Sequence, residues 1–220
     1  MRKQLPISIA NAPMNGLMYA YPYALIDAYP QYNAWLHENY ILPCAIKLFV
    51  NNDNVMCMHY LDACSFAEYN TAKPFMTING FCAENLYNED LIDWIKRCIE
   101  ATEYVVVFVD EYYLPECGMG GKEHYLHEEL IYGYDDDKQI LLSIGMNANW
   151  HFSEIELSYG DIRRAYEVGL TCSGHGNLNW AVKNRIRVVS FDKLSGRYPY
   201  NPERFLKKIE SYLLEKQMRV

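Results

Sequence analysis

The chain has 220 residues, of which 20 are Lys or Arg and 28 are Asp or Glu, so its formal net charge is −8. This acidity excludes a general binder of nucleic-acid backbones, which needs a basic surface to release counterions. No segment approaches the roughly 20 consecutive apolar residues of a membrane span. We therefore expect one folded domain over residues 1–220, without a nucleic-acid or membrane partner.

Cysteine and tyrosine contents indicate the compartment and the kind of core. The seven cysteines follow no disulfide framework, and the N-terminal segment lacks the apolar run of a signal peptide. We therefore expect reduced thiols and a cytoplasmic location. Tyrosine is the compositional outlier, with 20 residues against 8 Phe and 4 Trp. These rings either line a wet ligand cleft or serve as an amphipathic aromatic core.

The N-terminal half predicts helices around a hairpin. Residues 17–41 form a helical pattern that Pro30 must kink or divide. An Asn-Asn-Asp-Asn turn at residues 51–54 separates two apolar runs and predicts a hairpin over residues 45–60. Asn88 is expected to cap a helix that runs to about residue 101, with Cys98 on its apolar, buried stripe.

The C-terminal half predicts mainly strands. The expected elements are a buried strand within residues 104–114, a hairpin of 130–134 and 139–144, a strand at 155–157, a helix capped by Ser158, a strand at 187–191 and a helix over 201–217 that begins at Pro202. Helices before and after antiparallel strands predict an α+β fold. No glycine-rich phosphate-binding motif lies between a strand and a helix, so we expect no nucleotide cofactor.

Three groups of short motifs follow one another along the chain. The early group is Tyr21-Pro22, Tyr29-Pro30-Gln31-Tyr32 and Asn39-Tyr40-Ile41; the second is Asp110-Glu111-Tyr112-Tyr113-Leu114-Pro115; the third begins at His127 and ends in Gly133-Tyr134-Asp135-Asp136. In this order they resemble papain-like cysteine peptidases, in the bacterial branch of double-glycine leader peptidases and butirosin biosynthesis protein H homologues. The resemblance covers about residues 10–170.

The resemblance implies a papain-like fold, in which an N-terminal helical part and the helix over 201–217 pack on an antiparallel sheet. The branch includes amide synthetases of the closthioamide type, found beside nonribosomal peptide assembly lines. It therefore implies an amide synthase of natural-product biosynthesis that moves a polythioamide acyl chain, through a cysteine acyl-enzyme, onto an amine such as 1,3-diaminopropane. The implied partners are an acyl or peptidyl carrier protein and a diamine acceptor.

The resemblance also assigns catalytic residues. His127, six residues before Gly133, matches the family histidine and is expected to act as the base. Cys44 is the expected nucleophile, because it precedes the histidine with sheet between them. The chain departs from the family at the start of the first helix, where Tyr21 and Pro22 stand in a stretch without the usual cysteine. Cys117, in a glycine-rich loop, is the alternative nucleophile.

Further site residues follow from the same layout. Asn147 is expected to orient the imidazole of His127, and a Cys–His dyad without a third residue is the alternative. Gln31 and Asn39 are candidate donors to an oxyanion. Neither the group of Cys117, His124 and His127 nor the pair Cys172 and His175 has the ligand spacing of a zinc site, so we expect no metal.

Two other functions stay open at this point. The same fold could serve as a cysteine peptidase or thioesterase, and a homologue without activity could bind a ligand only. The residues do not choose between a synthase and a hydrolase. Because the chain is acidic overall, docking of an acidic carrier protein is expected to use local basic groups, namely Arg163, Arg164, Lys183, Arg185 and Arg187.

Overall fold

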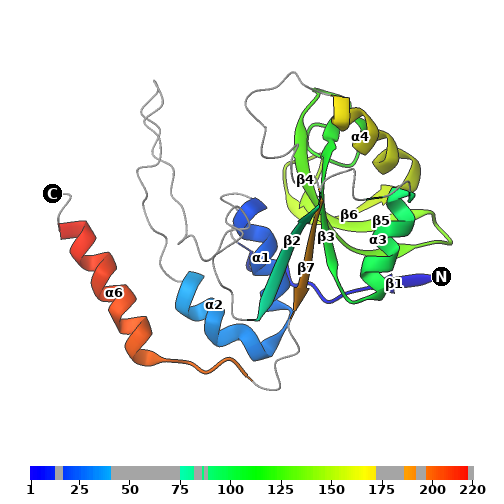
Figure 1. Cartoon of the computed structure of the whole chain (residues 1–220). Coiled ribbons are helices and arrows are strands. Elements are labelled where there is room, and N and C mark those ends of the chain that lie inside the picture. Colours follow the sequence, from blue (N-terminus) through cyan, green and yellow to red (C-terminus); the bar gives the residue numbers. More distant parts are fainter. Residues whose placement is uncertain are drawn as a thin grey trace. The chain divides into compact units, whose positions relative to one another are not determined.

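A computed structural model of the chain describes residues 1–12, 17–40, 75–81, 86, 89–171, 186–191 and 197–217. Contacts within the chain divide it into two compact units, which we describe one at a time (Figure 1). The sheet unit comprises Met1–Pro6 and Pro74–Asp192, and the second unit comprises Ile7–Lys73 and Lys193–Val220. The expectation of a single domain over the whole chain stays a prediction.

The sheet unit is built on an antiparallel sheet. In spatial order its strands are β2 (Met76–Phe81), β7 (Ile186–Phe191), β3 (Tyr104–Asp110), β4 (Leu126–Asp135), β5 (Ile140–Met146) and β6 (Phe152–Ser158), and β1 (Arg2–Gln4) pairs with the end of β4. Every pairing is antiparallel, and helices accompany the sheet. The predicted α+β class is therefore confirmed, including the hairpin of β4 and β5 and the strands β6 and β7.

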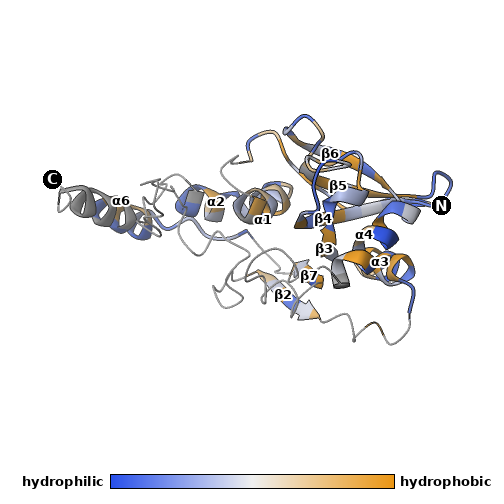
Figure 2. Cartoon of the chain, turned by 90° about the horizontal axis from the view of Figure 1, so that it is seen from above, coloured by the Kyte–Doolittle hydropathy of each residue, from blue (hydrophilic) through white to orange (hydrophobic). Residues whose placement is uncertain are grey.

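Two helices, α3 (Leu91–Glu100) and α4 (Tyr159–Thr171), lie side by side against β3. Figure 2 shows hydrophobic and hydrophilic residues alternating around α3, as its apolar stripe predicts. Cys98 is buried on that stripe, which confirms its place in the core, and burial raises its pKa to about 12. Ser158 caps α4 as expected, because its Oγ accepts a hydrogen bond from the backbone N–H of Asp161 at 3.0 Å.

The cap of α3 differs from the prediction. Asp90, not Asn88, is the N-cap residue, and its carboxylate accepts hydrogen bonds from the backbone N–H groups of Ile92 and Asp93. The same carboxylate pairs with Arg163 of α4, at 2.8 Å from Nε, and this pair lowers the pKa of Asp90. A carboxylate at this position satisfies free N–H groups and interacts favourably with the helix dipole. The helix therefore begins two residues later than a cap at Asn88 would place it.

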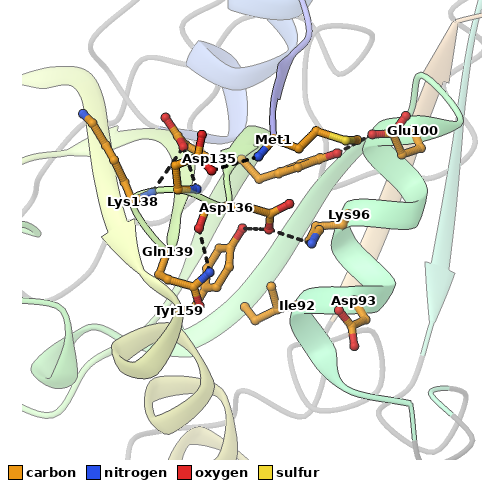
Figure 3. A network of polar contacts seen from close by, with 12 residues as sticks. Met1, Ile92, Asp93, Lys96, Glu100, Asp135, Asp136, Lys138, Gln139 and Tyr159 are labelled. Carbon is orange, nitrogen blue, oxygen red and sulfur yellow. Dashed lines mark hydrogen bonds and ion pairs between the residues drawn. The ribbon is translucent and has the colours of Figure 1, made fainter.

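The turn between β4 and β5 is tied to both helices (Figure 3). Asp136 accepts hydrogen bonds from Lys96 Nζ of α3 at 2.6 Å and from the Tyr159 hydroxyl of α4 at 3.0 Å. The bond from Lys96 lowers the pKa of Asp136. Asp135 accepts hydrogen bonds from the backbone N–H groups of Asp137 and Lys138. Asp136 therefore ties this turn to both helices.

β3 lies within the range of residues 104–114 where a buried strand was predicted. It ends at Asp110, whose carboxylate accepts a hydrogen bond from the backbone N–H of Tyr112 at 3.2 Å and turns the chain into the 3-10 helix η4 (Glu111–Tyr113). All seven residues of β3 are buried. Two carboxylates, Asp110 and Glu111, are thereby held at the buried end of the central strand.

The described part of the second unit is helical. It contains α1 (Leu17–Asp27), the 3-10 helix η1 (Pro30–Tyr32), α2 (Asn33–Tyr40) and α6 (Pro202–Gln217). Pro30 separates α1 from α2, which confirms the predicted division. Glu38 of α2 accepts from the backbone N–H of Asn201 and pairs with Arg204, so the start of α6 is fastened to α2. The hairpin expected over residues 45–60 lies outside the described residues. In the described ranges, no helix combines the length and the apolar character needed to cross a membrane.

Candidate functional site

The candidate site lies where β3 ends and β4 begins. The two strands pair so that Val109 lies opposite His127 and Asp110 lies opposite Leu126. The acidic residues that follow β3 are therefore brought beside the histidine-containing start of β4. In the sequence the same groups are separated by a loop of more than ten residues.

His127 makes its closest polar contact with Glu111. Nδ1 of the imidazole lies 2.9 Å from Oε1 of Glu111, and the side chains are 24% and 4% exposed, respectively. The ring nitrogen does not meet hydrogen-bond geometry with this oxygen, so the contact is an ion pair. Nε2 lies 3.9 Å from Oε2 of Glu128, which is too long for a hydrogen bond and leaves this nitrogen available to a reacting group.

The surrounding carboxylates decide the charge of His127. Burial by itself lowers the pKa of the imidazole, but the contact with Glu111 and the charges of Glu128 and Glu129 outweigh it and raise the pKa to about 9. The ring therefore carries a proton at neutral pH. An imidazolium of this kind stabilises a neighbouring thiolate and can give its proton to a leaving group, as in papain-type cysteine enzymes.

Glu129 lies on the same strand as His127 and is fully buried. Oε2 accepts a hydrogen bond from Ser143 Oγ of β5 at 3.0 Å. Gly145 makes room for the carboxyl group, since a Cβ at that position would lie 2.8 Å from Oε2. Burial, followed by the charge of Glu111, raises the pKa of Glu129 to about 8. At neutral pH Glu129 is therefore largely a neutral acid beside the ion pair.

Cys117 completes the buried side of the site. Its backbone pairs with Asn147 in an isolated bridge, and its Sγ lies 3.5 Å from Oε1 of Glu129. Burial and the charge of Glu129 raise the pKa of Cys117, which opposes formation of the thiolate that a nucleophile needs. The geometry therefore favours Cys117 as a packed hydrogen-bond donor over its alternative role as the nucleophile.

Asn147 is engaged in the turn between β5 and β6. Its Nδ2 donates to Ser153 Oγ at 3.0 Å, and its Oδ1 accepts from the backbone N–H groups of Asn149 and His151 at 2.9 and 3.0 Å. The residue beside Nδ1 of His127 is Glu111, which the sequence did not single out for that position. The signal that could have found it is the Asp-Glu pair directly after the most apolar strand of the chain.

Glu111→Gln should lower the pKa of His127 towards its ordinary value near 6.5, because it removes the carboxylate that contributes most to raising it. Asn147→Ala should leave that titration unchanged and destabilise the fold by about 1 kcal/mol, since two turn N–H groups lose their acceptor. NMR titration of the His127 ring and thermal denaturation measure the two effects. The assignment would be contradicted if the pKa of His127 shifted in Asn147→Ala and stayed unchanged in Glu111→Gln.

The other predicted site residues belong to the second unit or fall outside the described residues. Cys44, Cys172 and His175 are outside the described residues. Gln31 and Asn39 belong to the second unit, where Asn39 Nδ2 donates to the Trp35 carbonyl at 2.7 Å. Among the described side chains, no group of three or more His, Cys, Asp and Glu is arranged to hold a metal ion. The sequence matches no protein-family model and no curated protein.

Proposed function

We propose that the chain is an amide synthase with a papain-like fold, which moves an acyl chain from a carrier-protein thioester onto an amine through a cysteine acyl-enzyme. The observation that carries the proposal is the His127–Glu111 pair at the start of β4, with Nδ1 held by a buried carboxylate and Nε2 available. Papain-like enzymes take the histidine from the start of a strand in an antiparallel sheet. The α+β class and the motif order around His127 agree with that arrangement.

The proposed mechanism uses His127 first as an acid and then as a base. A thiolate attacks the thioester carbonyl, and the carrier's sulfur leaves with the proton of the His127 imidazolium. The imidazole, now neutral, takes a proton from the attacking amine while the new C–N bond forms and the enzyme's sulfur leaves as a thiolate. Glu111 holds the ring in one orientation and stabilises its charged form throughout the cycle.

The proposal takes Cys44 as the nucleophile. The burial of Cys117 beside Glu129 supports this choice, because a thiol with a raised pKa is a poor nucleophile at neutral pH. Cys98 is excluded from the role by the same physical argument, since it is buried in α3 and its pKa is raised to about 12. Of the described cysteines, neither is therefore suited to the chemistry.

The proposed carrier interface needs exposed cations. Arg187 is buried and lies over the Phe108 ring, and Arg163 pairs with Asp90, so neither is available to a partner without breaking a contact. Arg164 is exposed and lies over the ring of Tyr113, next to the site. Lys183 and Arg185 lie outside the described residues. Of the basic residues named for docking, Arg164 is therefore the one within the described ranges that we still propose as a contact for the carrier protein.

The decisive experiment is intact-mass analysis after incubation with an N-acetylcysteamine thioester, with and without 1,3-diaminopropane. We expect an acyl adduct that maps to Cys44, is absent in Cys44→Ala, persists in the matched control Cys98→Ala, and yields the amide when the diamine is added. Free acid as the sole product with every amine would identify a hydrolase. Wild-type protein that binds the thioester without adduct or turnover would identify a homologue that only binds.

A further inference from the structure

A second imidazole–carboxylate pair lies beside the first one. Nδ1 of His124 is 2.7 Å from Oδ2 of Asp110, which directly precedes Glu111 in the chain. The two pairs therefore share the same end of the sheet, with both carboxylates at the end of β3 and both histidines around the start of β4. The mechanism proposed above uses only the His127 pair.

Asp110 is held in a fixed position. The residue is 1% exposed, and its Oδ1 accepts hydrogen bonds from the backbone N–H groups of Tyr112 and Tyr125 at 3.2 and 3.1 Å. Its other oxygen, Oδ2, is thereby directed to His124. Because a carboxylate only accepts hydrogen bonds, it selects the tautomer of His124 with the proton on Nδ1.

The imidazole of His124 is ordered on one side and open on the other. Its ring stacks on Tyr112, with centroids 4.3 Å apart and an angle of 28° between the planes, and Tyr113 lies 5.8 Å away. The side chain is nevertheless 48% exposed, and among the described residues Nε2 has no partner. With the proton on Nδ1, Nε2 of the neutral ring carries the lone pair and is the exposed atom that can accept a proton.

Transfer of the acyl group to an amine requires the removal of one more proton from the acceptor than hydrolysis does. A primary alkyl amine resembles a lysine side chain, whose ordinary pKa is about 10.4, so at neutral pH it arrives as an ammonium ion without a lone pair. Its nitrogen must lose two protons on becoming an amide, whereas attacking water needs to lose only one to become the acid. His127 returns to its protonated form by accepting one proton, so the amine reaction needs a second acceptor.

We propose that Asp110 and His124 supply this second acceptor: Nε2 of His124 takes the first proton of the ammonium group, and Asp110 positions the ring. The inference rests on the proposed acyl transfer. In the balanced step the C–N bond forms, the C–S bond breaks, one proton of the nitrogen goes to His124 and one to neutral His127, and the enzyme's sulfur leaves as a thiolate. His124 is therefore a catalytic residue for amine acceptors alone, and Asp110 is its positioning residue.

The test compares the amide and the free acid formed from one acyl-enzyme. In His124→Gln, amide formation from 1,3-diaminopropane should fall about 100-fold, the scale of a positioned proton acceptor, while hydrolysis stays at the wild-type rate. Aminoacetonitrile, a weakly basic amine that is mostly neutral at the assay pH, should react at the wild-type rate. His37→Gln, which replaces an exposed histidine of α2, serves as the matched control and should change neither product.

A second readout does not depend on activity. In Asp110→Asn the amide oxygen can still accept from the two backbone N–H groups, but the amide nitrogen now faces Nδ1 and donates, which moves the ring proton of His124 to Nε2. Nitrogen NMR shifts of the ring should report the Nδ1–H tautomer in the wild type and the Nε2–H tautomer in the variant. The variant should also lose amide formation selectively.

The possible results distinguish failure of this inference from failure of the proposed function. Wild-type protein that makes no amide overturns the proposed function and the inference with it. Wild-type amide formation that His124→Gln leaves unchanged, or that falls together with hydrolysis and with the aminoacetonitrile reaction, overturns the inference and leaves the synthase standing. A wild-type His124 found in the Nε2–H tautomer overturns it in the same way, because its outer nitrogen would then be unable to accept a proton.

Discussion

Replacing His127 by asparagine should lower the rate of acyl transfer at least ~100-fold, the usual scale for a positioned acid and base. In the proposed mechanism the side chain acts twice: the imidazolium gives its proton to the carrier's sulfur, and the neutral imidazole then takes a proton from the acceptor. Asparagine keeps a polar group near Glu111 but cannot carry the proton. The measurement is the single-turnover rate of amide formation from an N-acetylcysteamine thioester.

The variant also leaves Glu111 without its cation in a buried site, so folding must be followed in the same samples. The rate should be normalised to the folded fraction, read from circular dichroism at the assay temperature. His37→Gln provides the control for loss of an exposed histidine and should retain the wild-type rate. A loss below roughly tenfold in folded His127→Asn, well under the scale of acid–base catalysis, would make His127 a structural residue.

The wild-type protein should lose stability between about pH 4.5 and pH 9, and Glu129→Gln should remove a large part of that loss. The folded pKa of His127, about 9, exceeds its ordinary value near 6.5, so its contribution is complete below pH 6.5 and is lost as the pH rises through 9. Glu129 acts in the same direction. Its folded pKa is about 8 against an ordinary 4.5, so ionisation opposes folding increasingly as the pH rises to 8.

A glutamine at position 129 can accept from Ser143 as the carboxyl group does, but it never ionises. Glu129→Gln should therefore resemble the wild type below about pH 4 and exceed its stability above pH 8 by at least about 1 kcal/mol, since one pKa unit corresponds to about 1.4 kcal/mol. For a chain of this size that is a rise of roughly 2–4 °C in the thermal midpoint.

Thermal denaturation across the pH range measures the effect. The control is Glu116→Gln, which neutralises an exposed carboxylate near the same loop and should leave the pH profile unchanged. A wild-type midpoint that stays constant or rises from pH 6 to pH 9 would show that Glu129 is already ionised in the folded protein. The description of the buried acid beside the ion pair would then be wrong.

The elements that sequence patterns predicted best are those with a strong local signal. Pro30 disfavours a helical conformation of the residue before it, and Tyr29 is extended, so α1 and α2 are separated there. The run within β3 is apolar on both faces, and its burial follows directly. The turn signals around Asp135 fixed the hairpin of β4 and β5 to within a few residues.

Elements that depend on distant partners were missed or misplaced. β1 and β2 have weak patterns of their own and exist because β4 and β7 offer them edges for pairing. The start of α3 was assigned to Asn88, although Asp90 can both cap the helix and pair with Arg163 of α4. Local capping preferences alone could not separate these two residues, because both are good N-cap residues.

The residues of the candidate site were likewise predicted only in part. By itself the sequence determined an acidic α+β chain, and it marked His127 through its position in a motif at the start of a strand. Only the tertiary structure decided what surrounds that histidine, because antiparallel pairing of β3 with β4 brings Glu111 to Nδ1 and burial sets the protonation of Glu129. Desolvation and charge pairing depend on distances across the sheet, and those distances are fixed by strand register and not by spacing along the chain.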